Sequence, residues 1–258
     1  MKNILLIAVL NIICWKLSLT LKPRIAQGSF VNIEDYPYQA NLIDYGSDER
    51  TYKEPICGAS IISSQWLVTA GHCLVDKPKE ELKVRTGATY RYNDGKEHEI
   101  DEMIIHPDFE RYYYTISNDI ALIKLTEPIE VNSVQKPILL PTSFDKPVPG
   151  KKLTITGFGR EGMNDDGKTP QLKVAKLTIV SLGKCRELYY FDPVTDNVLC
   201  AGTDAASTCN GDSGGPAVMH GRLAGIVSSG FLCSTIDIPA TFTNINKYIN
   251  WILKYVKI

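Results

Sequence analysis

Residues 209–216 read Cys-Asn-Gly-Asp-Ser-Gly-Gly-Pro, and this stretch is more informative about fold and chemistry than any other part of the chain. Ser213 is followed by two glycines and preceded by Asp212, an arrangement that suits a nucleophile on a tight turn. Small neighbours let the chain bend and bring backbone N–H groups close to a bound carbonyl oxygen. A glycine-rich surface turn has a similar composition, so other parts of the chain must decide between the two.

Two further motifs carry a histidine and an aspartate. Residues 69–73 read Thr-Ala-Gly-His-Cys, and residues 117–122 read Ser-Asn-Asp-Ile-Ala-Leu. A serine hydroxyl needs a base at hydrogen-bond distance to become a nucleophile near neutral pH. Histidine can take that proton, and a carboxylate can fix the histidine tautomer. Taken singly, His72 could be structural and Asp119 could cap a turn; together with Ser213 they form a candidate catalytic set.

In the chain order His, Asp, Ser, these motifs resemble the chymotrypsin/trypsin family of serine endopeptidases. The resemblance runs from about Ile25 to the C-terminus and includes residues 66–70, 157–159 and 225–228. It implies that the protein transfers acyl groups through a covalent acyl-enzyme, and it assigns a role to each of several residues. His72 is the expected base, Asp119 its partner and Ser213 the nucleophile; Ser228 binds Asp119, and the N–H groups of Gly211 and Ser213 form the oxyanion hole.

The expected fold class is all-β. The chain has 258 residues, 44% of them hydrophobic, which is enough for one large domain or two small ones. Short apolar stretches alternate with turn signals and predict strands that include residues 59–62, 66–69, 82–85, 120–125, 153–156, 217–220, 222–228 and 240–244. Helical spacing is seen only from Ile245 to Val256. The resemblance implies two packed six-stranded antiparallel β-barrels with a C-terminal helix. The expected domains are residues 25–136, with His72 and Asp119, and residues 137–258, with Ser213 and the helix.

The N-terminal residues differ from the rest. Lys2 precedes an apolar run from Ile4 to Trp15, so residues 1–20 are predicted to be a secretory signal peptide and residues 21–24 an activation propeptide. A signal anchor is the alternative. The protein is therefore expected to be secreted and extracellular, without a membrane-bound part in its mature form. A monomer is expected.

The charge of the chain bears on its partners. The full chain has a net charge of −1, with 28 basic and 29 acidic residues. Removing residues 1–24 takes away four basic and no acidic residues, which leaves 24 against 29 and a net charge of −5. Without a concentrated basic face or a nucleic-acid motif, nucleic acid is not an expected partner.

Seven cysteines become six once Cys14 is assigned to the signal peptide, and an even number suits an oxidising compartment. Sequence alone leaves about 15 pairings open. The family resemblance selects Cys57–Cys73, Cys185–Cys200 and Cys209–Cys233. No cofactor and no metal are expected: Cys-x-x-Cys is absent, and the loop Gly87 to Ile100 is short and has Ala88 where the family usually has a calcium ligand.

Activation and specificity are expected from the same resemblance. Cleavage after Arg24 by a trypsin-like protease would free the Ile25 amine to pair with Asp212, so the precursor would be a zymogen. The alternative is that Arg24 is an ordinary exposed residue. Ala26 and Gln27 depart from the family's usual second and third residues.

The primary specificity pocket is expected at Ser207, Ser228, Gly230 and Ala240. Ser207 places no charge at the pocket floor, and Ala240 adds a methyl group where glycine is usual, so cleavage after apolar or aromatic residues is expected, with Trp disfavoured. Asp237 is the alternative source of a charge.

The expected partners are protein or peptide substrates, the activating protease and protein protease inhibitors. Ser229 stands where the family usually has tryptophan, which removes contact area for extended substrates. The alternative function is therefore a protease-fold binding protein with weak or no turnover.

Overall fold

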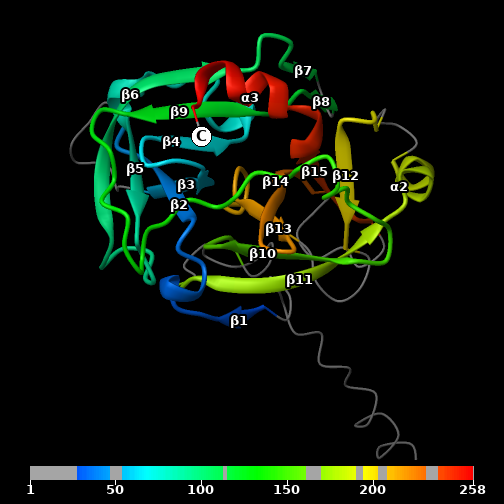
Figure 1. Cartoon of the computed structure of the whole chain (residues 1–258), viewed down its shortest axis with the longest axis horizontal. Coiled ribbons are helices and arrows are strands. Elements are labelled where there is room, and N and C mark those ends of the chain that lie inside the picture. The colour runs from blue at the N-terminus through cyan, green and yellow to red at the C-terminus, as the bar shows by residue number, and fades with distance from the viewer. Residues whose placement is uncertain are drawn as a thin grey trace, which may run out of the picture.

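The computed structural model describes residues 28–46, 54–112, 115–160, 170–189, 194–202, 208–230 and 238–257. Within these residues the chain forms two antiparallel β-barrels packed side by side, as predicted, with short helices at the edges (Figure 1). No described helix has the length and apolar character needed to cross a bilayer.

The first barrel closes in the order β2-β3-β4-β9-β6-β5. Its strands are β2 (Gln39–Asp44), β3 (Glu54–Ile61), β4 (Trp66–Thr69), β5 (Leu82–Thr86), β6 (Lys96–Ile105) and β9 (Ala121–Leu125). A separate hairpin pairs β7 (Glu110–Tyr112) with β8 (Thr115–Ser117). The barrel is filled by branched apolar side chains such as Leu42, Leu67 and Ile123, all fully buried.

The second barrel orders its strands β11-β10-β13-β14-β15-β12 and closes through pairing of β11 with β12. The strands are β10 (Lys152–Gly157), β11 (Lys173–Val180), β12 (Val198–Ala201), β13 (Pro216–Met219), β14 (Arg222–Ser229) and β15 (Ala240–Asn244). Helix α2 (Leu182–Leu188) connects β11 to β12, and the Ser181 hydroxyl caps it by accepting from the Lys184 N–H at 3.2 Å.

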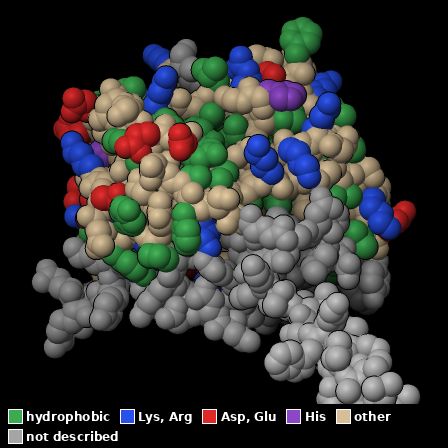
Figure 2. Space-filling model, turned by 90° about the horizontal axis from the view of Figure 1, so that it is seen from below, with side chains coloured by type: hydrophobic (Ala, Val, Ile, Leu, Met, Phe, Trp, Pro, Cys, Tyr) green, Lys and Arg blue, Asp and Glu red, His purple; other side chains and the backbone are tan. Residues whose placement is uncertain are grey.

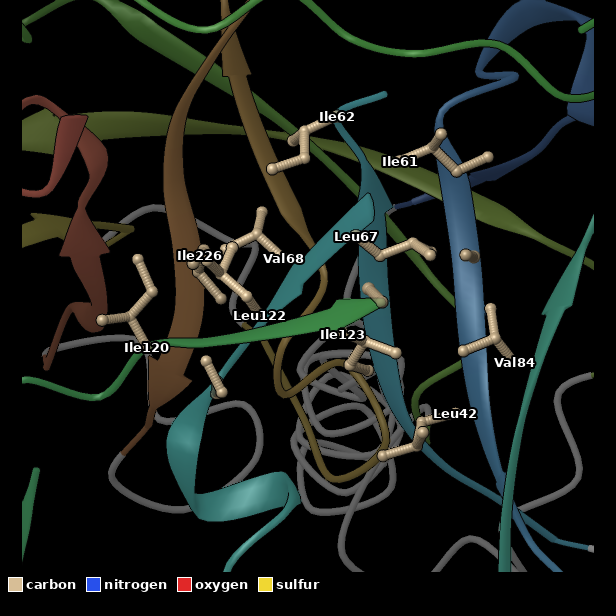
Figure 3. Close-up of a cluster of buried hydrophobic side chains, with 14 of the residues drawn as sticks. Leu42, Ile61, Ile62, Leu67, Val68, Val84, Ile120, Leu122, Ile123 and Ile226 are labelled. Carbon is tan, nitrogen blue, oxygen red and sulfur yellow. The ribbon is translucent and has the colours of Figure 1, made fainter. Parts of the chain in front are cut away.

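Strand β14 is buried on both faces and joins the two barrels. Ala224 and Val227 pack in the core of the second barrel, whereas Leu223 and Ile226 pack in the core of the first. Figure 3 shows Ile226 close to Leu122, a residue of β9. Apolar side chains of β14 therefore form part of the contact between the barrels.

The chain ends cross between the barrels. Near the N-terminus, β1 (Ser29–Phe30) pairs with β11 of the second barrel. After η4 (Ile245–Lys247), helix α3 (Ile249–Tyr255) buries Trp251 and Ile252 in the core of the first barrel, above β9 in Figure 1. The predicted C-terminal helix is confirmed, with its first turn a 3-10 helix. The predicted domain boundary, near Lys136 to Pro141, lies between β9 and β10.

The remaining described 3-10 helices are η1 (Ile33–Asp35), η2 (Gly71–Cys73) and η3 (Lys79–Glu81). On the face shown in Figure 2, Lys and Arg side chains are interspersed with Asp and Glu and with apolar side chains.

Candidate active site

His72 and Asp119 lie at the same end of the first barrel. His72 follows β4 within η2, and Asp119 lies between β8 and β9. The Nδ1 atom of His72 is 2.8 Å from Asp119 Oδ2, and the His72 backbone N–H donates to Oδ1 at 2.9 Å. Two bonds to one carboxylate fix both the imidazole plane and the backbone that carries it. The Cys57–Cys73 disulfide, formed as predicted, connects η2 to β3.

Asp119 is almost fully buried, with 3% of its surface exposed. The Ser228 hydroxyl donates to Oδ2 at 2.5 Å, and the Thr243 hydroxyl donates to the Asp119 carbonyl oxygen at 2.6 Å. Burial alone would raise the pKa of Asp119, but the bonds and charge of His72 and the hydroxyl of Ser228 keep it below its ordinary value. The aspartate is therefore ionised at neutral pH and can stabilise an imidazolium.

The turn that carries Ser213 is held against the first barrel. The Gly58 N–H of β3 donates to the Ser213 carbonyl oxygen at 2.7 Å. Gly214 has a φ of +76°, and a Cβ there would lie 2.2 Å from the Thr69 hydroxyl oxygen. Only glycine fits this approach of the two barrels, which brings the Ser213 turn against Thr69 at the end of β4, three residues before His72.

Among the hydrogen bonds of the described residues, none joins the Ser213 hydroxyl to His72, whose Nε2 lies 3.7 Å from Cys73 Sγ. Catalytic hydrogen bonds are often long in enzymes without substrate and shorten when the substrate binds. The N–H groups of Gly211 and Ser213 also donate to no other described residue. Both N–H groups are thus available to a carbonyl oxygen.

Asp212 points away from the Ser213 side, toward the segment 157–159. Its carboxylate accepts from the Gly159 N–H at 2.9 Å and from the Cys209 N–H at 3.0 Å. A Cβ on Gly157 or Gly159 would lie 2.3–2.4 Å from the carboxylate, so glycine is required at both positions. Burial raises the pKa of Asp212 to about 6, and nearby Arg91 and Lys173 oppose the rise.

The described residues of the expected specificity pocket lie on or next to β14 and β15, which pair with each other. Ala240 is 1% exposed on β15, and Gly230 follows β14. A Cβ on Gly230 would lie 3.3 Å from the Thr208 hydroxyl oxygen, so Thr208 faces this glycine. Sequence reasoning missed Thr208, although its position directly before Cys209 and after Ser207 is a usable signal.

Several predicted residues lie outside the described part of the chain: Arg24, Ile25, Ser207, Cys233 and Asp237. The Cys185–Cys200 disulfide is formed as predicted. Cys209 is also disulfide-bonded, and its predicted partner Cys233 lies outside the described residues.

In the loop Gly87 to Ile100, where calcium is not expected, backbone and side-chain oxygen atoms bind other groups of the protein. Arg85 donates to the Arg91 carbonyl oxygen at 2.7 Å and to Glu97 Oε1 at 2.6 Å. Asp94 accepts from the backbone N–H groups of Thr89 and Tyr90, both at 2.8 Å. A guanidinium therefore lies where carbonyl and carboxylate oxygens of the loop converge.

Cys57, His72 and Cys73 form a cluster with the spacing of metal ligands. Both sulfur atoms belong to the disulfide, so neither is a thiolate, and His72 Nδ1 is bonded to Asp119. This cluster does not have the donor set of a zinc site.

Comparison with known proteins agrees with the geometry. The Trypsin family model matches residues 25–252. The chain is 33% identical over 234 residues to "Trypsin" of Phaedon cochleariae, covering 89% of this chain and 87% of that protein. It is 35% identical over 201 residues to "Serine protease 1" of Homo sapiens, covering 76% and 78%. It is 33% identical over 252 residues to "Tissue-type plasminogen activator" of Bos taurus, covering 89% of this chain but 44% of that protein.

A nearly buried carboxylate bonded to a histidine beside a glycine-flanked serine defines a hydrolase of the serine-nucleophile class. The chain belongs to the trypsin family of serine proteases.

Proposed function

We propose that the protein is a secreted serine endopeptidase in which Ser213 is the nucleophile, His72 the general base and Asp119 its orienting partner. The observation that carries this proposal is the pair of bonds from His72 to a buried, ionised Asp119 that Ser228 also binds.

The proposed reaction has two stages. As the Ser213 Oγ–carbon bond forms, the hydroxyl proton moves to His72 Nε2, and the carbonyl oxygen becomes an oxyanion that accepts from the Gly211 and Ser213 N–H groups. The imidazolium, stabilised by Asp119, then gives its proton to the leaving amine, and the C–N bond breaks. Water, deprotonated by His72, then attacks the acyl carbon; the bond between Ser213 Oγ and that carbon breaks, the imidazolium returns its proton to Oγ, and the acid is released.

A fluorophosphonate probe tests the nucleophile directly. Protein activated with trypsin should be labelled at Ser213, and Ser213→Ala protein treated identically should not be. His72→Ala should abolish most labelling, because the hydroxyl loses its base. A folded, activated protein that takes no label would instead support the alternative, a binding protein with weak or no turnover.

We also propose that the peptide bond cut follows an apolar or aromatic residue. In trypsin, an aspartate in the primary pocket sets the preference for the residue before the scissile bond. This chain has Ser207 at that place in the sequence, and the described wall offers Thr208, Gly230 and Ala240, none of them charged. Peptides that differ only in the residue before the scissile bond decide the matter; a preference for Arg would defeat the apolar assignment.

The burial and the raised pKa of Asp212 support zymogen activation by cleavage after Arg24. A buried carboxylate whose pKa is raised to about 6 gains stability from an ammonium partner, which the freed Ile25 amine would supply. Arg24→Gln protein exposed to trypsin should stay nearly inactive, whereas the wild type should gain activity with loss of its N-terminal segment. Full activity of the uncleaved variant would refute the proposal.

A further inference from the structure

Arg91 lies in the loop between β5 and β6 of the first barrel, and only 7% of its surface is exposed. Its Nη1 donates to the carbonyl oxygen of Phe158, directly after β10 of the second barrel, at 2.7 Å. Its Nη2 donates to the carbonyl oxygen of Pro55, on β3, at 3.4 Å. A guanidinium can be buried where oxygen atoms accept its hydrogens, so Arg91 bridges the two barrels.

The backbone of Arg91 is fixed as well as its side chain. Its N–H donates to the Pro170 carbonyl oxygen at 3.0 Å, and its own carbonyl oxygen accepts from Arg85 Nη1 at 2.7 Å. The preceding residue, Tyr90, forms an antiparallel bridge with Gln171, just before β11. Because the chain is held on both sides of the loop, the planar guanidinium is presented to the second barrel in one orientation.

The segment that accepts from Arg91 packs against the turn before Ser213. The Gly159 N–H donates to Asp212 Oδ1, and the Arg160 N–H donates to the Asn210 carbonyl oxygen, both at 2.9 Å. A Cβ on Gly211 would lie 3.2 Å from the Cα atom of Gly159, so the two backbones are in direct contact there. Residues 158–160 thus form one wall of the turn that carries the proposed oxyanion donors.

A single peptide group connects Arg91 with Asp212. The C=O of Phe158 and the N–H of Gly159 belong to the same planar unit, in which they point in opposite directions. The guanidinium of Arg91 binds the oxygen, and the carboxylate of Asp212 binds the hydrogen. Each bond polarises the amide in the direction that strengthens the other. The charge of Arg91 also lowers the pKa of Asp212, against the effect of burial.

We propose that Arg91 is a positioning residue for the oxyanion hole: by holding the peptide group between Phe158 and Gly159, it sets the place of Asp212 and of the Gly211 N–H. The inference rests on the proposed endopeptidase function and adds a side chain of the first barrel to its machinery. Arg91 touches no reacting atom and acts through this peptide group alone.

Arg91→Met keeps an unbranched side chain in place but removes the charge and every donor. In trypsin-activated protein, its kcat on a peptide that the wild type cleaves should fall about tenfold or more, with KM within about threefold. Complete loss of one oxyanion donor costs about 10²–10³ in kcat, and a displaced donor costs part of that. A change confined to kcat marks an interaction made in the transition state.

Thr86→Val is the matched control for a loss of buried polar bonds. Thr86 lies on β5 and is fully buried; its hydroxyl donates to Gln135 Oε1 at 2.6 Å and lies 2.8 Å from His98 Nε2, both in the first barrel. This variant should be destabilised but should keep kcat within about twofold of the wild type. An equal fall of kcat in Thr86→Val and Arg91→Met would overturn the inference, because general loosening would then explain both.

A pair of inhibitors reports on the oxyanion hole directly. In the complex with a peptide aldehyde, Ser213 Oγ bonds to the aldehyde carbon, the hydroxyl proton passes to His72, and the aldehyde oxygen becomes an oxyanion. The Ki of the aldehyde that matches the substrate should rise in Arg91→Met by the same factor by which kcat falls. The Ki of the corresponding alcohol, which forms no oxyanion, should stay within about twofold. Equal changes for the two inhibitors would contradict a role in positioning the donors.

Hydrogen exchange gives a readout that needs no activity. In uncleaved protein, the amides of Gly159 and Arg160 should exchange about tenfold or more faster in Arg91→Met than in Thr86→Val, and equal rates would overturn the inference. If Arg91→Met does not fold, Arg91→Lys decides: it keeps the charge but not the planar fork, so kcat should fall about threefold or more, and an unchanged kcat would refute the role. Failure of fluorophosphonate labelling in the wild type would refute the proposed function separately, while hydrogen exchange would still report on Arg91.

Discussion

The sharpest test of the structure is Gly159→Ala. The added Cβ would lie 2.4 Å from Cγ and Oδ1 of Asp212 and 2.5 Å from Oδ2, well inside the 3.0 Å that real contacts respect. The carboxylate or the segment 157–159 must move, and the 2.9 Å bond from the Gly159 N–H is lost. A hydrogen bond to a charged group contributes about 1.5–3 kcal/mol, so we expect the free energy of unfolding to fall by about 2–3 kcal/mol.

The same displacement should also lower the rate of acylation. Asp212 lies between Gly211 and Ser213, whose N–H groups we propose as oxyanion donors, and loss of one such donor costs about 10²–10³ in kcat. Urea denaturation and single-turnover acylation of activated protein measure the two effects. The matched control is Gly183→Ala in α2, where an added Cβ meets nothing within 4 Å. If Gly159→Ala folds as stably as the control and acylates within twofold of it, the assigned position of Asp212 is wrong.

Four further outcomes are expected. Because the folded-state pKa of Asp212 is raised from 3.8 to about 6, its contribution to stability is full below pH 4 and is lost as pH rises through 6. In urea denaturation of uncleaved protein, the free energy of unfolding of the wild type relative to Asp212→Asn should fall by about 3 kcal/mol from pH 4 to 7, and equal pH slopes in the two proteins would contradict this. Ala240→Gly should raise kcat/KM for Trp before the scissile bond, relative to Leu, by roughly tenfold or more, and a peptide series with no change would exclude Ala240 from the pocket. Arg85→Met should lower the free energy of unfolding by about 2–3 kcal/mol, because Glu97 loses the guanidinium and keeps only the Tyr45 hydroxyl among the bonds described here, and the Arg91 carbonyl oxygen loses the Arg85 donor. Lys184→Met, in an exposed pair with Glu187, should cost under about 0.5 kcal/mol. Excess EDTA should leave the melting temperature of the wild type unchanged; a drop would show that a metal ion contributes.

The strands that sequence patterns predicted are those with short apolar runs. Trp66–Thr69 and Ala240–Asn244 form β4 and β15 with the predicted bounds. β2 was missed because its buried residues include Gln39, whose amide bonds to the Thr156 hydroxyl across the barrel contact, a partner invisible to local patterns. β6 was missed because acidic and basic side chains fill its exposed face. Helix α2 has a cap signal at Ser181, which could have been recognised.

The candidate site shows the same division between local and distant information. The three sequence motifs and their order along the chain were enough to select His72, Asp119 and Ser213. The family resemblance supplied Ser228, whose hydroxyl donates to the Asp119 carboxylate in the structure. Thr243, 124 residues from Asp119, could not be found that way, since its bond depends on how β15 packs against the first barrel.

The crossing of the chain ends has a consequence for how this protease could be divided. A cut between β9 and β10 would divide the polypeptide into two halves. The first half would carry β1, which pairs with β11 of the second barrel. The second half would carry α3, whose Trp251 and Ile252 pack in the core of the first barrel. Each fragment would expose the surface that the other's terminus covers. The halves are thus complementary parts for reconstitution, and neither is an autonomous folding unit.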